Sequence, residues 1–170
     1  MNATDIFKYG QLTVLQAIDG LPETAWERPG ACGIWSVKDI IAHLVSYEEV
    51  LIDILSGFVG RYPTPCLDKF IELGDRFNDT EVERRKERTV REILDEFKDA
   101  HAQVTSVAER IRPAVFRQTG TLPWYGIGYA LDDVLVYMYY GHKREHSAQI
   151  AAFRDLLKDD VNLRPGNLNK

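Results

Sequence analysis

Residues 131–156 read LDDVLVYMYYGHKREHSAQIAAFRDL. Apolar and histidine side chains recur in this stretch at steps of three or four residues, the spacing of one face of an α-helix. They are Leu131, Leu135, Met138, His142, His146, Gln149, Phe153 and Leu156. The stretch therefore predicts a long helix whose inner face changes from apolar to polar halfway along.

The same spacing predicts two helices near the start of the chain. The first covers about Asn2–Asp19, with Thr4 as a candidate N-cap. The second begins at Ser36, where Asp39 follows at the position of a capping box, and it ends near Gly57. Such side chains satisfy the backbone amides that have no partner in the first turn of a helix.

A further helix begins at Thr89, where Glu92 completes a second capping box, and runs to Pro113. The connection before it contains a candidate short helix at Leu67–Leu73 and a charged segment at Asp79–Arg88. This connection is long enough for a crossover. Four long amphipathic helices without a convincing strand predict an all-α four-helix bundle, and its helices need not alternate up and down.

Composition indicates one globular domain and argues against one class of partner. A chain of 170 residues with 45% hydrophobic residues can bury one core. We assign the bundle to residues 1–157 and a loosely packed C-terminal tail to residues 158–170. A net charge of −5, with no dense basic cluster, argues against nucleic acid as a partner.

The sequence also favours a cytoplasmic protein. No apolar run reaches the roughly 20 residues that a membrane span needs. The N-terminus lacks the basic start and apolar run of a signal peptide. The two cysteines, Cys32 and Cys66, form no CxxC pair and are interpreted as free structural thiols.

His142 and His146 are the sharpest chemical feature, because a spacing of four residues places both rings on one helix face. Both continue the inner face of the predicted helix, where an unpaired polar group costs about 1–3 kcal/mol. Binding a shared metal ion would satisfy them. Hydrogen bonds to Glu145 or to a tyrosine hydroxyl are the alternative.

His43 lies on or beside the inner face of the second helix. Three inward histidines from two helices can bind a divalent ion and leave coordination positions for water or substrate, as in catalytic zinc sites. His101, beside the inner face of the third helix, is a weaker candidate for a fourth ligand.

Other residues are candidates by position alone. Those that can orient the imidazoles are Glu48, Glu145 and Gln149. Those that can form an apolar pocket over an ion are Trp124, Tyr125, Tyr139 and Tyr140. The alternative is that Glu48, Glu145 and Gln149 are solvated side chains or ordinary packing amides, and that the aromatic residues belong to the core.

The run WSVKDIIAHL at residues 35–44, followed by His142-x-x-x-His146-x-x-Gln149, resembles the DinB superfamily over most of the chain. The resemblance implies a four-helix bundle, often a homodimer, that binds zinc, nickel or a similar ion through a histidine triad. The triad here would be His43, His142 and His146. It also implies the metal-dependent transfer of low-molecular-weight thiols to electrophiles.

The chain is also similar, in its length and in the segment LPWY at residues 122–125, to a branch that includes the colibactin self-resistance protein. That branch does not depend on the triad, so the triad here favours metal binding. We expect a metal-dependent thiol S-transferase or detoxifying hydrolase with a small-molecule substrate. The alternatives are a non-catalytic small-molecule binding or stress-protection protein, and a purely structural bundle.

Overall fold

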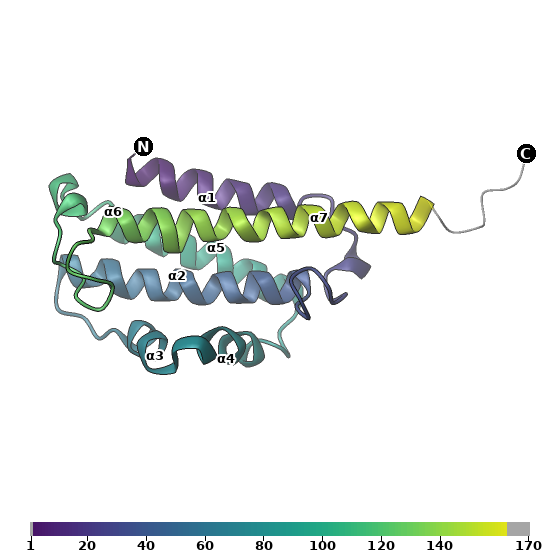
Figure 1. The fold of residues 1–170 in the computed structure, drawn as a ribbon, viewed down its shortest axis with the longest axis horizontal. Helices are drawn as coiled ribbons and strands as arrows, with labels where there is room; N and C mark the ends of the chain where they lie inside the picture. Colours follow the sequence, from purple (N-terminus) through teal and green to yellow (C-terminus); the bar gives the residue numbers. More distant parts are fainter. Residues whose placement is uncertain (1, 163–170) are drawn as a thin grey trace, which may run out of the picture.

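The computed structural model describes residues 2–162 (Figure 1). Its elements are α1 (Ala3–Ile18), η1 (Glu23–Ala25), α2 (Val37–Val59), α3 (Pro65–Leu73), η2 (Gly74–Arg76), α4 (Phe77–Arg84), α5 (Val90–Ala108), η3 (Pro113–Arg117), α6 (Leu131–Val134), η4 (Leu135–Gly141) and α7 (His142–Asn162). The element η4 is a π-helix that joins α6 to α7 without a break. The described residues form helices and no named strand, which confirms the predicted all-α class.

Four long helices lie side by side: α1, α2, α5 and the continuous helix α6–η4–α7 (Figure 1). Helices α1 and α7 run in one direction, and α2 and α5 run in the other. Two successive long helices, α2 and α5, are therefore parallel, and the chain between them must return along the bundle. Helices α3 and α4 make this return along α2, which confirms the expected crossover.

A buried cluster of charges holds the end of the crossover in place. Arg85, which directly follows α4, has a side chain that is only 1% exposed. Its guanidinium lies 2.8 Å from Glu49 of α2, 2.8 Å from Glu81 of α4 and 3.1 Å from Glu96 of α5. Because the five guanidinium hydrogens can serve several carboxylates at once, one arginine links three helices.

The predicted capping boxes are present at the starts of α2 and α5. The amide of Asp39 donates to Ser36 Oγ at 3.2 Å, and the Ser36 amide donates to Asp39 Oδ2 at 2.9 Å. Thr89 and Glu92 repeat this pair of bonds at 3.2 and 2.8 Å. The cap predicted at the start of α1 was wrong, because Asn2 rather than Thr4 accepts the bond from the first turn.

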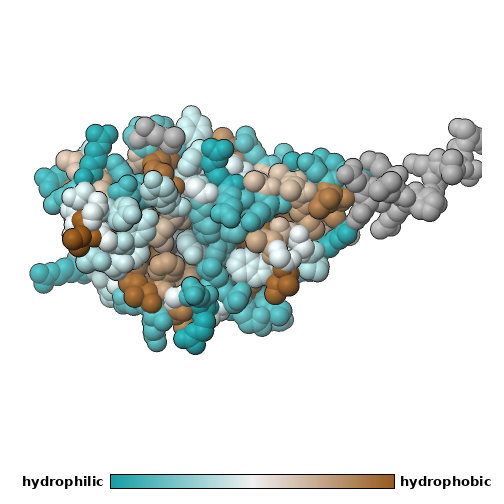
Figure 2. Space-filling view, viewed as in Figure 1, coloured by the Kyte–Doolittle hydropathy of each residue, from teal (hydrophilic) through white to brown (hydrophobic). Residues whose placement is uncertain are grey.

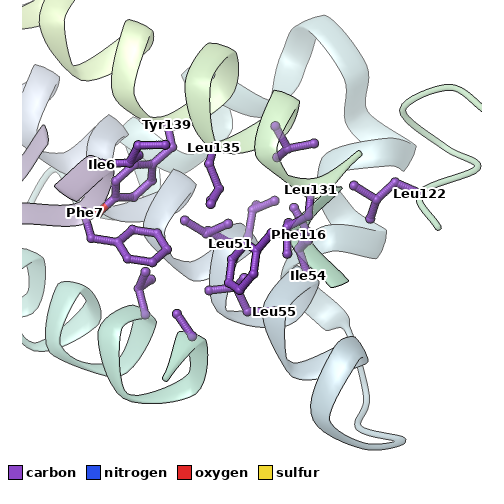
Figure 3. Close-up of a cluster of buried hydrophobic side chains, with 14 of the residues drawn as sticks. Ile6, Phe7, Leu51, Ile54, Leu55, Phe116, Leu122, Leu131, Leu135 and Tyr139 are labelled. Carbon is purple, nitrogen blue, oxygen red and sulfur yellow. The ribbon is translucent and has the colours of Figure 1, made fainter. Parts of the chain in front are cut away.

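Two groups of buried apolar residues fill the bundle, one toward each end. Figure 3 shows the first, in which Leu51 and Leu55 of α2 lie close to Leu131 and Leu135 of the last helix. The second surrounds the first half of α2 and includes Ile40, which is fully buried. The part of α2 between Ile40 and Leu51 carries the buried polar residues His43 and Glu48.

In the last helix, the residues that point into the bundle differ from those predicted. Its seven-residue π-helix, η4, holds more residues per turn than an α-helix, and the inner face moves by one residue. Tyr139, 3% exposed, takes the inner place predicted for Met138, and Lys143 is buried at 2%. Further along, Leu156 was predicted to be inside but is 64% exposed.

The predicted end of one other helix was wrong. Helix α5 ends at Ala108, because the chain turns before Pro113, which begins a separate short helix. The charged segment contains a helix of its own, α4. In the predicted tail, residues 158–162 continue α7, and residues 163–170 lie outside the described residues.

The surface carries both hydrophobic and hydrophilic side chains. Figure 2 shows hydrophobic side chains in small groups among hydrophilic ones on the face it presents. Exposed large apolar residues occur on α1, as Tyr9 and Leu12, and on η4, as Val136 and Tyr137. Among the described residues, no helix is both long enough and apolar enough to cross a membrane.

Candidate metal centre

The three predicted histidines converge on one point between α2 and α7. His142 Nε2 lies 2.8 Å from His43 Nε2 and 2.9 Å from His146 Nε2. One ligand atom from each of the three residues can be chosen so that all lie within 4.8 Å of one another. The sequence placed these residues on the inner faces of two helices, and the fold brings them into one cluster.

The cluster is shielded from water, which keeps its imidazoles neutral. Burial, followed by repulsion from the other two histidines, lowers the pKa of His43 to about 2. Burial also lowers the pKa of His142 to about 3, helped by His146 and Lys143, and lowers that of His146. A neutral imidazole has a lone pair to offer a metal, so near neutral pH all three rings are in the form that binds metal.

Gln149 orients one of these rings, as the sequence suggested. Its Oε1 lies 2.8 Å from His146 Nδ1. An amide oxygen only accepts hydrogen bonds, so Nδ1 carries the hydrogen and Nε2, which faces the other histidines, has the lone pair. This arrangement, with one ring nitrogen donating to a fixed acceptor, is typical of histidines that bind metal ions.

Aromatic rings surround the other two histidines. The Trp35 ring centroid lies 5.0 Å from that of His43, and the Tyr47 centroid lies 4.8 Å from His43 and 4.4 Å from His142. Tyr47 is held by a hydrogen bond of 3.2 Å from its hydroxyl to Asn78 of α4. The crossover thus helps to fix the side of the cluster.

The aromatic residues predicted to form a pocket do not do so. Tyr139 lies in a separate buried cluster, and Trp124 packs against Phe70 and Tyr125. Tyr140 lies near Arg144 instead. The rings that do contact the histidines, Trp35 and Tyr47, were missed as site residues. Spacing alone could have indicated Tyr47, which lies four residues after His43 on the same helix.

Glu48, Glu145 and His101 do not join the triad. Glu145 is exposed on α7. Glu48 is fully buried and forms an ion pair with Lys143, and its Oε1 also accepts a hydrogen bond of 3.2 Å from the Tyr139 hydroxyl. His101 Nδ1 lies 3.0 Å from that hydroxyl, so His101 belongs to this second cluster and is not a fourth ligand.

The two cysteines are free thiols outside the cluster, as predicted. Burial raises the pKa of Cys66 to about 11, and the neighbouring carboxylates of Asp53, Glu49 and Glu81 act in the same direction. A thiol must lose its proton to be a strong nucleophile, so Cys66 is unreactive near neutral pH.

Fold and site together define a helical bundle with a buried three-histidine cluster between two of its long helices. A model of the DinB superfamily matches residues 7–150, a range that includes all three histidines. The chain belongs to the DinB superfamily. Searches of curated proteins and of solved structures found no significant match.

Proposed function

We propose that this protein binds one divalent metal ion, zinc or nickel, through His43, His142 and His146. The residues of this site would then support the addition of a low-molecular-weight thiol, or of water, to a small electrophile. The observation that carries this proposal is the convergence of three neutral imidazoles, with Nε2 contacts of 2.8 and 2.9 Å at His142.

The donor set fits a first-row divalent ion. Imidazole nitrogen suits zinc and nickel, whereas magnesium and calcium prefer oxygen. The Nε2 atoms of the three rings face one another at hydrogen-bond distance, and a shared ion would satisfy all three at once. Three protein ligands are also the number at which a zinc site stays open to substrate.

A bound ion would supply a positive charge that lowers the pKa of a thiol or water in the open position, giving a nucleophile near neutral pH. The chain's own residues position the site. Gln149 fixes the tautomer of His146, and Trp35 and Tyr47 enclose the rings and keep water away. A soft thiolate matches zinc or nickel better than a hard oxygen donor does, which favours thiol transfer over hydrolysis.

Metal content tests the first part of the proposal. The full chain is stripped with a chelator, reconstituted with zinc or nickel, desalted and measured by mass spectrometry of the metal. We expect one ion per chain and a loss of most of it in His142→Ala. His101→Ala is the matched control, because His101 is another partly buried histidine of the bundle and should leave the metal in place. Reconstituted protein without bound metal would overturn the proposal.

Activity tests the second part. The metal-loaded protein is incubated with a low-molecular-weight thiol and a haloaromatic or epoxide electrophile, and the conjugate is measured by chromatography. We expect conjugation above the uncatalysed rate that disappears with the chelator and in His142→Ala. Metal binding with tight retention of the electrophile and no turnover would instead support the sequestration alternative.

A further inference from the structure

A pocket that is open to the surface lies between α1 and α5, with a volume of about 320 Å³. The residues that line it are Thr4, Phe7, Lys8, Gln11, Leu12, Leu15, His101 and Thr105. Its volume is within the range of about 300–1,000 Å³ that is usual for small-molecule pockets. None of the triad histidines is among the lining residues, so this pocket is separate from the candidate metal centre.

Two of the lining residues lead into the buried Glu48–Lys143 cluster. Gln11 Oε1 accepts a hydrogen bond of 3.2 Å from Lys143 Nζ. His101 Nδ1 contacts the Tyr139 hydroxyl at 3.0 Å, and that hydroxyl contacts Glu48 Oε1. The surface of the pocket is therefore almost wholly apolar, but two of its lining residues, Gln11 and His101, are held in place by a network in the bundle interior.

The directions of these hydrogen bonds determine what His101 offers to the pocket. Glu48 Oε1 accepts from Lys143, so it carries no proton, and the Tyr139 hydroxyl hydrogen points toward it. The Tyr139 oxygen is then free to accept, and the hydrogen of His101 lies on Nδ1. In the neutral ring, the other nitrogen, Nε2, is left as an acceptor.

We infer that the pocket between α1 and α5 binds a small apolar molecule of the phenol class, whose hydroxyl donates a hydrogen bond to His101 Nε2. The side chains of Phe7, Leu12 and Leu15 supply the apolar walls. Gln11, whose oxygen is occupied by Lys143, has amide hydrogens that can donate to the same hydroxyl oxygen.

The surroundings of His101 keep it in the accepting form. Burial, followed by the positive charge of Lys143, lowers its pKa to about 4, so the ring is neutral near pH 7. Glu48 also faces it, with Oε1 3.9 Å from Nδ1, and Lys8 lines the same pocket. This second site does not depend on the proposed metal chemistry, and a ligand bound here need not be a substrate of the triad.

The test compares p-cresol with toluene, which has a similar apolar body but no hydroxyl. Binding to the full chain is followed by NMR titration, with and without chelator. We expect p-cresol to bind roughly two- to tenfold more tightly, the range of one net hydrogen bond. We also expect the chelator to have no effect. His101→Phe keeps a ring at this position without the acceptor, and it should remove the preference.

Two substitutions of equally exposed residues locate the site. Leu12 and Val136 are both 41% exposed, but only Leu12 lines the pocket. Leu12→Trp should fill the pocket and abolish p-cresol binding, whereas Val136→Trp should leave it unchanged. Nitrogen-15 spectra should show the His101 hydrogen on Nδ1 and a shift of Nε2 when p-cresol binds. Equal affinity for the two probes, or unchanged binding in Leu12→Trp, would overturn the inference.

Discussion

Replacing Glu48 by glutamine should destabilise the protein strongly, and the loss should depend on pH. Glu48 and Lys143 form an ion pair in the interior, with side chains that are 0% and 2% exposed. The substitution keeps the size of the side chain but removes the charge opposite Lys143. Removing one member of a buried pair typically costs about 3–5 kcal/mol, because the remaining charge is left without a partner.

The stability that Glu48→Gln loses has an upper limit, because Lys143 can release its proton. Burial already lowers the pKa of Lys143, and Glu48 opposes that shift. Holding a lysine with an ordinary pKa of about 10.4 in its neutral form at pH 7 costs about 4.6 kcal/mol, at about 1.36 kcal/mol per pH unit. The limit falls to about 1.9 kcal/mol at pH 9 by the same relation.

The direction of this pH dependence follows from the number of protons bound in the folded and unfolded states. In the variant, Lys143 is neutral in the folded state while it still binds a proton in the unfolded state, so stability rises with pH up to the pKa of the unfolded chain. Urea unfolding of the full chain at several pH values between about 7 and 9.5 measures this. We expect the difference between wild type and Glu48→Gln to shrink by more than half over this range.

Two controls make the experiment specific. Glu145→Gln removes an exposed carboxylate from α7 and should change stability by less than about 0.5 kcal/mol. The double variant Glu48→Gln with Lys143→Met removes both buried charges and should recover most of the loss. If Glu48→Gln were as stable as wild type at pH 7, or if its defect were the same at every pH, the argument for a buried ion pair would be refuted.

Three further outcomes follow from the structure. Without metal, stability should fall as the pH drops from about 6.5, by about 1.4 kcal/mol per unit each for His43 and His142, because these two rings bind protons only when the chain unfolds. The lowered pKa of His146 acts in the same direction, and a flat profile in urea unfolding between about pH 5 and 7 would contradict this. Arg85→Ala should cost about 1.5–3 kcal/mol in thermal or urea unfolding, because it removes buried charge-assisted hydrogen bonds while Glu81 keeps its more exposed partners Lys69 and Arg84. Arg91→Ala, whose side chain is 92% exposed, should cost under about 0.5 kcal/mol, and similar losses in both would be inconsistent with a buried charge cluster. Gln149→Leu should weaken zinc binding about 10- to 100-fold in competition with a chelator, and an unchanged affinity would show that the amide does not orient His146.

The starts of α2 and α5, and the places of the three histidines on helix faces, were predictable from the sequence because they depend on short-range patterns. A capping residue and its partner are three positions apart, and the two histidines of α7 are four apart. His43 was found because its position relative to Ile40 and Tyr47 marks the inner face of α2. Residue spacing identifies the inner face of a helix wherever the helix keeps a regular number of residues per turn.

The buried ion pair could not be predicted in this way. The π-helical turn before α7 moves the inner face by one residue, so that Tyr139 and Lys143 point inward. A periodic reading with 3.6 residues per turn places Met138 inside and Lys143 toward the edge. Glu48 was noticed on α2, but its partner lies 95 positions further along the chain.

The sequence by itself determined that the chain is an acidic helical bundle with three histidines on inner helix faces, because caps and apolar periodicity act within a few residues. Tertiary structure decided which groups meet. Only the packing of α2 against α7 joins His43 to His142 and His146, and only the crossover brings Tyr47 into contact with Asn78. Contacts between distant segments depend on helix direction and register, and these are settled when the apolar faces pack together.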